Sequence, residues 1–229
     1  MKMDYKQFDA QSQSVWNANM YDDICKTALS RCSLLQQANL DFSRASILDI
    51  GCGPGGISQA LLRRNKIREI ALMDLRVEGL QIAADNLRKI DKDQKLFLID
   101  GDVHHIPLTD NLFSLVISRG SQRFWIDQYR AFQEIHRVLE PDGIAYIGGG
   151  RGSSTFQKHR ELNDPDWNPE SFRRDRHFLK HLPSYLLPDE AYQALFQEWN
   201  VPWAIYSNEG DGHWFCWQKR VLEKIPIPG

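Results

Sequence analysis

A short apolar run ends in an acid and then opens into a glycine-rich stretch. The order of residues is Ile47-Leu48-Asp49-Ile50-Gly51-Cys52-Gly53-Pro54-Gly55-Gly56. Glycine leaves out the side chain where a backbone must turn sharply or approach a ligand closely. If the amphipathic segment 57–63 is a helix, its free N–H groups point back at the same place. With the Asp49 carboxylate at the strand tip, this stretch predicts a site for a nucleoside-containing cofactor.

Three further groups of residues follow later apolar runs. Asp74 closes the run Ile70-Ala71-Leu72-Met73, about 20 residues beyond the glycines, which is the separation at which an acid binds ribose hydroxyls. Gly101-Asp102-Val103 follows the third run, where the acid suits the exocyclic amine of adenine and the valine would pack on the ring. Ser118-Arg119-Gly120-Ser121 follows the fourth run. Together with the glycine loop, these groups predict a pocket for an adenosine derivative.

The same residues admit other interpretations. The string Gly51-x-Gly53-x-x-Gly56 also satisfies the dinucleotide fingerprint, so an NAD(P)-dependent oxidoreductase is the first alternative. An acid two residues before the first glycine would repel a pyrophosphate, whereas it would attract a ligand with ammonium and sulfonium groups. Asp74 or Asp102, taken singly, fits a helix cap equally well. Their joint register with the apolar runs favours the cofactor site.

Strand and helix patterns alternate from Ser46 onward, and these elements must position the groups above. Expected strands are 46–50, 69–73, 96–99, 112–117 and 144–148, and expected helices are 55–64, 77–90 and 126–139. A turn is expected at 141–143, a helix from Pro188 to about Asn200, and then a hairpin of strands 203–207 and 213–218. The pattern predicts an α/β fold with a doubly wound, Rossmann-like, seven-stranded, mostly parallel sheet whose last strand is antiparallel. Ligands bind such sheets at the carboxyl ends of the strands.

The chain is expected to form a single domain over residues 1–229. Residues 1–43 would be a helical N-terminal cap, 44–150 the cofactor-binding core, 151–184 a helical insert, and 185–229 a C-terminal helix and hairpin. In the cap, Trp16 and Tyr21 are candidates for a lid over the pocket, although plain packing on the sheet is favoured for Trp16.

Composition narrows the classes of function. A formal net charge of -2 gives no overall field that would attract nucleic acid or an anionic membrane. No secretory signal is recognisable at the polar N-terminus, and no apolar run approaches the length of a bilayer span. Four scattered cysteines fit a reducing compartment better than a disulfide framework. We therefore expect a cytoplasmic protein with no metal site and no nucleic-acid or membrane partner.

The order acid-x-Gly-x-Gly-x-Gly at 49–55 resembles the first motif of class I S-adenosylmethionine-dependent methyltransferases. Arg137-Val138-Leu139-Glu140-Pro141-Asp142-Gly143 resembles the fifth-strand entry of their small-molecule, ubiquinone-biosynthesis-like group, methyltransferase type 11, and the resemblance covers roughly residues 45–150. It implies S-adenosylmethionine as cofactor. Its methionine part would be held by Asp49, Gly51, Cys52, Gly53 and Gly55, its ribose by Asp74 and Leu75, and its adenine by Asp102 and Val103. Ser118 would offer its backbone near the sulfonium, with Arg119 completing the cofactor site.

The methyl acceptor would lie above the fourth strand, near Tyr21, Arg119, Phe124 and Trp125. Arg119 would clamp a carboxylate or phosphate of the acceptor, or else pair with Glu134 or another local acid. The two aromatic rings would stack on the acceptor, or else belong to the core. Methyl transfer from a sulfonium is an in-line displacement that mainly needs alignment and exclusion of water, so no catalytic dyad is required.

A small-molecule acceptor is expected, because the fourth strand is not followed by Asn/Asp-Pro-Pro-Tyr/Phe and the chain has no Pro-Cys nucleophile. The remaining alternatives are a non-catalytic partner protein that binds S-adenosylmethionine and a methyltransferase of peptides or proteins. Among the histidines, His104 and His105 would lie near the adenine, too far from the methyl group to act as a base, and His136 is expected to be exposed.

Overall fold

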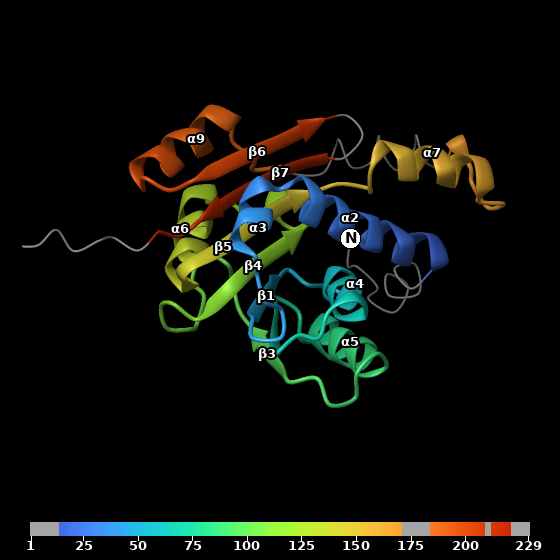
Figure 1. Ribbon diagram of the computed structural model, residues 1–229, viewed down its shortest axis with the longest axis horizontal. Helices are drawn as coiled ribbons and strands as arrows, with labels where there is room; N and C mark the ends of the chain where they lie inside the picture. The colour runs from blue at the N-terminus through green and yellow to red at the C-terminus, as the bar shows by residue number, and fades with distance from the viewer. Residues whose placement is uncertain (1–13, 171–183, 209–211, 221–229) are drawn as a thin grey trace, which may run out of the picture.

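The computed structural model describes residues 14–170, 184–208 and 212–220, with a seven-stranded sheet of order β3-β2-β1-β4-β5-β7-β6 at its centre (Figure 1). The strands are β1 (Ser46–Ile50), β2 (Glu69–Asp74), β3 (Leu96–Asp100), β4 (Phe113–Arg119), β5 (Leu139–Gly149), β6 (Trp203–Asn208) and β7 (Gly212–Gln218). Neighbours among β1 to β5 are parallel, whereas β7 is antiparallel to both β5 and β6. The predicted sheet and its antiparallel last strand are confirmed.

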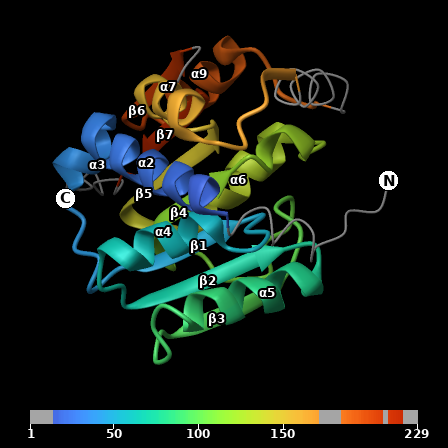
Figure 2. The ribbon, with the colours of Figure 1, turned by 90° about the vertical axis from the view of Figure 1, so that its right-hand side faces the viewer.

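Helices cover both faces of this sheet (Figure 2). One face carries α2 (Val15–Arg31), α3 (Ser33–Ala38), α4 (Gly56–Arg64) and α5 (Val77–Arg88), and the other carries α6 (Gln128–Val138) and α9 (Asp189–Glu198). Successive side chains of a strand point to opposite faces. In β1, Ile47 therefore joins the core under α2 to α5, while Leu48 and Ile50 join the core under α6 and α9. Asp49 consequently faces α4.

Strand β5 differs from the prediction at its start. It begins at Leu139 rather than at residue 144, and the expected turn at 141–143 lies inside the strand. Asp142 has a φ of 65°, and the register with β4 shifts between Phe113 and Leu115. The turn residues thus form a bulge rather than a reversal, because Lys219 bonds both Asp142 and Gly143 and extends the pairing with β7.

The N-terminal cap and the insert meet at α2. Trp16 packs on Phe156 and His159 of α7 (Ser154–Asn163), with ring centroids 6.4 and 5.7 Å apart, so it has a packing role as expected but packs on the insert rather than on the sheet. The helical character expected for the insert is seen in α7, while residues 171–183, the cap residues 1–13, the hairpin turn at 209–211 and the tail 221–229 lie outside the described residues. Among the helices that the structure describes, none has the length and apolar character needed to cross a membrane.

His136 is not exposed as expected. Its ring stacks on Trp199 at a centroid distance of 4.3 Å, and its Nδ1 accepts a hydrogen bond from Trp217 Nε1 at 3.3 Å. Burial lowers the pKa of His136 to about 4, so the ring is neutral at physiological pH. It is a structural residue of the core between α6 and the final strands.

Candidate functional site

The loop between β1 and α4 has a backbone that only glycine adopts easily. Gly51, Gly53 and Gly55 have φ angles of 64°, 51° and 79°. At Gly51 the fit is also steric, since a Cβ there would lie 2.5 Å from the Cβ of Ser121. The N–H groups of Gly51 and Cys52 both donate to the carbonyl of Met73, at 2.7 and 3.1 Å. The loop is thereby fixed at the carboxyl ends of β1 and β2, with the start of α4 behind it.

Asp49 lies beneath this loop and is only 1% exposed. Its Oδ2 accepts a hydrogen bond of 2.6 Å from Ser58 Oγ on α4. Burial raises the pKa of Asp49 to about 7 against the effect of that hydrogen bond, and the charge of Asp74 adds to the rise. Within the described part of the chain, neither Asp49 nor Asp74 forms an ion pair. A cationic ligand at this position would relieve an existing electrostatic cost, so the acids fit an ammonium or sulfonium.

Asp74, at the end of β2, holds the glycine loop as well as facing the site. Its Oδ2 accepts the N–H of Gly53 at 2.9 Å, and its Oδ1 accepts the N–H of Arg76 at 3.1 Å. Burial raises its pKa, and these backbone hydrogen bonds oppose the rise. Each carboxylate oxygen keeps a further lone pair for a ribose hydroxyl. The neighbouring Leu75 is 69% exposed, which leaves an apolar side chain for a ligand to cover.

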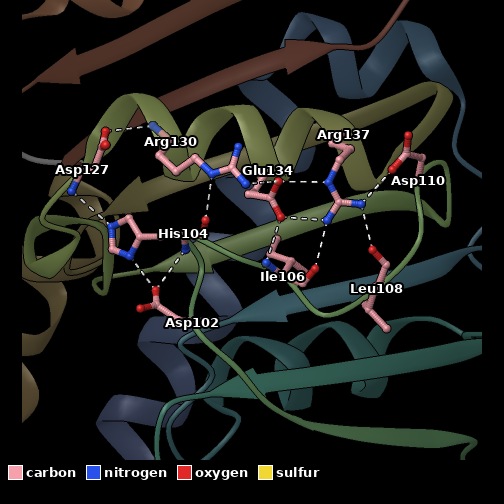
Figure 3. A network of polar contacts seen from close by, with 9 residues as sticks. All are labelled: Asp102, His104, Ile106, Leu108, Asp110, Asp127, Arg130, Glu134 and Arg137. Carbon is pink, nitrogen blue, oxygen red and sulfur yellow. Dashed lines mark hydrogen bonds and ion pairs between the residues drawn. The ribbon is translucent and has the colours of Figure 1, made fainter.

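Asp102 and Val103 lie in a tight turn after β3, which the backbone hydrogen bond from His105 to Asp102 closes; Figure 3 shows Asp102 and His104 in this turn. Val103 is buried in the core, which anchors the turn. Asp102 Oδ1 accepts two hydrogen bonds from His104, one from its backbone N–H at 3.0 Å and one from Nδ1 at 2.5 Å. Burial favours the neutral acid, but the hydrogen bonds from His104 outweigh it and hold the pKa of Asp102 below its ordinary value. Oδ2 has no bonded partner among the described residues, and the side chain is 50% exposed, so an acceptor oxygen is open to a ligand.

Sequence reasoning missed the role of His104. Its Nε2 accepts the backbone N–H of Asp127 at 3.1 Å, and its carbonyl accepts Arg130 Nε at 2.9 Å (Figure 3). Asp127 in turn caps α6 by accepting the N–H of Arg130 at 2.9 Å, which starts this helix two residues later than expected. The signal in the sequence was the Asp-x-His spacing, which lets a histidine ring fold back on the carboxylate.

Ser118 and Arg119 close β4 at the same edge. Ser118 is buried, and its Oγ donates to the carbonyl of Ile50 at 2.8 Å. Arg119 donates from Nε and Nη2 to the carbonyl of Gly150, at 3.2 and 2.7 Å, and its guanidinium lies 5.1 Å from the ring centroid of Tyr21. The alternative that Arg119 pairs with Glu134 is wrong, because Glu134 pairs with two other arginines, Arg130 and Arg137.

The aromatic residues expected near the acceptor have different surroundings. A Cβ on Gly56 would lie only 2.3 Å from Cε2 of Tyr21. Because glycine has no Cβ, α2 can pack directly on the start of α4. Phe124 is 47% exposed beside the end of β4. Trp125 is only 6% exposed and packs edge-on against Phe132, with centroids 6.4 Å apart. Trp125 therefore belongs to the core, which was the alternative given for it from the sequence, because the turn at 122–124 sends the ring of Phe124 outward and the next ring inward.

Three comparisons with known proteins each return a match to this chain. The family model described as "Methyltransferase domain" matches residues 48–147. A crystal structure of a candidate S-adenosyl-L-methionine-dependent methyltransferase from Methanococcus maripaludis is 28% identical, with a TM-score of 0.68 and 98% of each chain covered.

Two curated relatives match part of the chain. The uncharacterized methyltransferase YdaC of Bacillus subtilis is 34% identical over 102 residues, which are 44% of this chain and 54% of that protein. The mitochondrial arginine-hydroxylase NDUFAF5 of Rattus norvegicus is 34% identical over 113 residues, 49% of this chain and 31% of that protein. The chain thus spans about a third to a half of the length of these relatives.

Proposed function

We propose that this chain, which belongs to the class I S-adenosylmethionine-dependent methyltransferases, methylates a small-molecule acceptor by direct in-line transfer. The observation that carries the proposal is the grouping of Asp49, Asp74 and Asp102 on adjacent strand ends around a glycine loop. Neither of the two acids nearest the loop forms an ion pair within the described residues, and burial raises the pKa of Asp74 even though the charge of Arg76 lowers it, so the site favours a phosphate-free cation.

S-adenosylmethionine would supply a methyl group made reactive by the sulfonium. In the proposed orientation, the glycine loop and Asp49 hold its methionine part, and Asp74 and Leu75 hold its ribose. Asp102 binds the exocyclic amine of adenine, beside the turn anchored by Val103. The chain's own contribution is alignment and exclusion of water. The close contact between α2 and α4 suits that task, because it brings Tyr21 against the start of α4, directly after the glycine loop.

Two alternatives are less well supported. A dinucleotide site is disfavoured because Asp49 adds negative charge where a pyrophosphate would lie, and because the sheet has the order 3-2-1-4-5-7-6 with an antiparallel β7, unlike the dinucleotide-binding order 3-2-1-4-5-6. A purely cofactor-holding partner protein would need no acceptor surface, whereas Phe124 presents an exposed ring beside the end of β4. A peptide or protein acceptor is the remaining competitor of a small molecule.

The test uses the purified chain and S-adenosylmethionine labelled in its methyl group. Calorimetry with S-adenosylhomocysteine comes first, with NADH as competitor. We expect S-adenosylhomocysteine to bind, and we expect NADH to leave the affinity for S-adenosylhomocysteine unchanged. The labelled cofactor is then incubated with cell extract split by size into metabolites and proteins. Methyl label that appears in the metabolite fraction only when the active protein is present supports the proposal. Label found only in the protein fraction means that the acceptor is a protein rather than a small molecule. If S-adenosylhomocysteine does not bind, the cofactor assignment is refuted.

A further inference from the structure

We propose that His104 is a positioning residue that aims Asp102 at the exocyclic amine of adenine, and so makes the cofactor site select adenosyl over inosyl ligands. This inference rests on the proposed function, because it assumes that the turn after β3 receives the adenine. It goes further by assigning the discrimination to a residue that would not itself touch the ligand.

The first support is that His104 bonds only one of the two carboxylate oxygens of Asp102. Both hydrogen bonds from His104 converge on Oδ1, at 3.0 and 2.5 Å, and none of the described residues engages Oδ2. A free aspartate rotates about its terminal bond with little preference. The ring and backbone N–H of His104 remove that freedom, while the carboxyl side chain stays 50% exposed and open to a ligand.

His104 is in turn held from its other side. The backbone N–H of Asp127 donates to Nε2, so the proton of the neutral ring belongs on Nδ1, where it donates to Asp102. Arg130 Nε grips the carbonyl of His104 at 2.9 Å. The ring therefore bridges the turn after β3 and the start of α6, as Figure 3 shows. One face of α6 packs into the core through Ala131, Phe132 and Ile135, so His104 fixes the orientation of Asp102 against a helix that is itself held by the core.

The chemistry of the purine edge turns this orientation into selectivity. Adenine carries an amine at position 6, which donates to a carboxylate, and it carries an acceptor at N1. Hypoxanthine carries a carbonyl at position 6, which an ionised carboxylate repels. An Asp102 held in one orientation strengthens the binding of adenine and weakens the binding of hypoxanthine. An Asp102 that can rotate turns away from the carbonyl of hypoxanthine at little cost in free energy.

The experiment measures two affinities by calorimetry, for S-adenosylhomocysteine and for S-inosylhomocysteine, its 6-deaminated analogue. The ratio between them is the readout, and it does not depend on catalysis. We expect His104→Ala to weaken the adenosyl ligand about 10-fold while changing the inosyl ligand less than about 3-fold. His104→Asn keeps a donor near the position of Nδ1 and is expected to restore most of the ratio. His105→Ala, which removes an exposed imidazole from the same turn, is the matched control and leaves both affinities unchanged.

The outcomes separate this inference from the proposed function. If the unaltered chain binds S-adenosylhomocysteine but His104→Ala weakens both ligands equally, His104 only supports the fold and the inference is overturned. Unchanged affinities in His104→Ala overturn it as well. If the unaltered chain binds neither ligand, the cofactor assignment itself fails. A thermal melt of each variant identifies any that unfolds, and in that case the ratio in His104→Asn decides: a ratio as low as that of Asp102→Asn overturns the inference, and a preserved ratio supports it.

Discussion

Replacing Asp49 by asparagine should make the unliganded protein more stable at alkaline pH while weakening its grip on the cofactor. The side chain is 1% exposed, and burial raises its pKa from the ordinary 3.8 to about 7. Asparagine is nearly isosteric and keeps an oxygen that can accept the hydroxyl of Ser58. The substitution therefore removes the charge with little change in shape, which isolates the electrostatic cost of the site.

The magnitude follows from linkage between protonation and folding. A group whose pKa is raised in the folded state contributes stability that is complete below the unfolded pKa and is lost as the pH rises through the folded value. One pKa unit corresponds to about 1.4 kcal/mol, so ionising Asp49 costs the fold about 4 kcal/mol at pH 8. Part of that cost is already present at pH 5, and the stability difference between variant and parent should therefore grow by about 3 kcal/mol from pH 5 to pH 8.

Urea denaturation of both proteins at several pH values between 5 and 8 measures this difference. The change with pH is the test, because the new amide N–H groups of asparagine add a cost that does not vary with pH. Asp102→Asn is the contrasting control: the pKa of Asp102 is lowered from 3.8, so that variant should lose stability by an amount that stays constant between pH 5 and 8 and shrinks only as the pH falls below about 4. In calorimetry, S-adenosylhomocysteine should bind Asp49→Asn roughly 10- to 100-fold more weakly. A stability difference that stays constant across the pH range would refute the reasoning.

Two further predictions concern packing. Gly51→Ala should weaken S-adenosylhomocysteine binding at least about 10-fold and cost about 1–3 kcal/mol of stability, because residue 51 has a positive φ and the new Cβ would lie 2.5 Å from Ser121. Gly120→Ala is the control, since Gly120 also has a positive φ but a Cβ there would meet nothing within 4 Å. An equal loss in both variants would show that the contact with Ser121 is unimportant. Cys32 and Cys216, whose Sγ atoms lie 2.7 Å apart, should be joined by diamide, which accepts the two hydrogens of the thiols. Peptide mass spectrometry without reductant detects the bridge, and its absence after complete oxidation would contradict the geometry.

Much of the fold could be predicted because the relevant signals are local. Apolar runs and amphipathic segments fixed the order of strands and helices, and the rule that parallel strands end at one edge grouped the acids of β1, β2 and β3. The start of β5 could not be found in this way. Pro141-Asp142-Gly143 has turn chemistry in isolation, and backbone pairing with Lys219, directly after the neighbouring strand β7, keeps it inside the strand.

The site shows the same limit at the level of single side chains. Phe124 and Trp125 are adjacent and similar in chemistry, yet one is exposed and the other buried, because the path of the backbone after β4 decides which ring turns inward. The ring of His104 bonds a carboxylate two residues away, a local contact, but its anchorage to Asp127 depends on where α6 begins. Sequence spacing does not predict the contacts that a side chain makes with residues of another helix or strand.

The electrostatics of the three acids carry information beyond their positions. Asp49 and Asp74, beside the glycine loop, have raised pKa values because burial outweighs the hydrogen bonds to both acids and, at Asp74, the charge of Arg76. Asp102, at the far end of this row of strands, has a lowered pKa because His104 satisfies one of its oxygens. Negative charge is therefore unsatisfied at one end of the site and stabilised at the other. S-adenosylmethionine has the complementary distribution, with its ammonium and sulfonium at one end and a neutral adenine at the other. A site built only to cap strands would have no reason to order its acids in this way, and that order supports the proposed orientation of the cofactor.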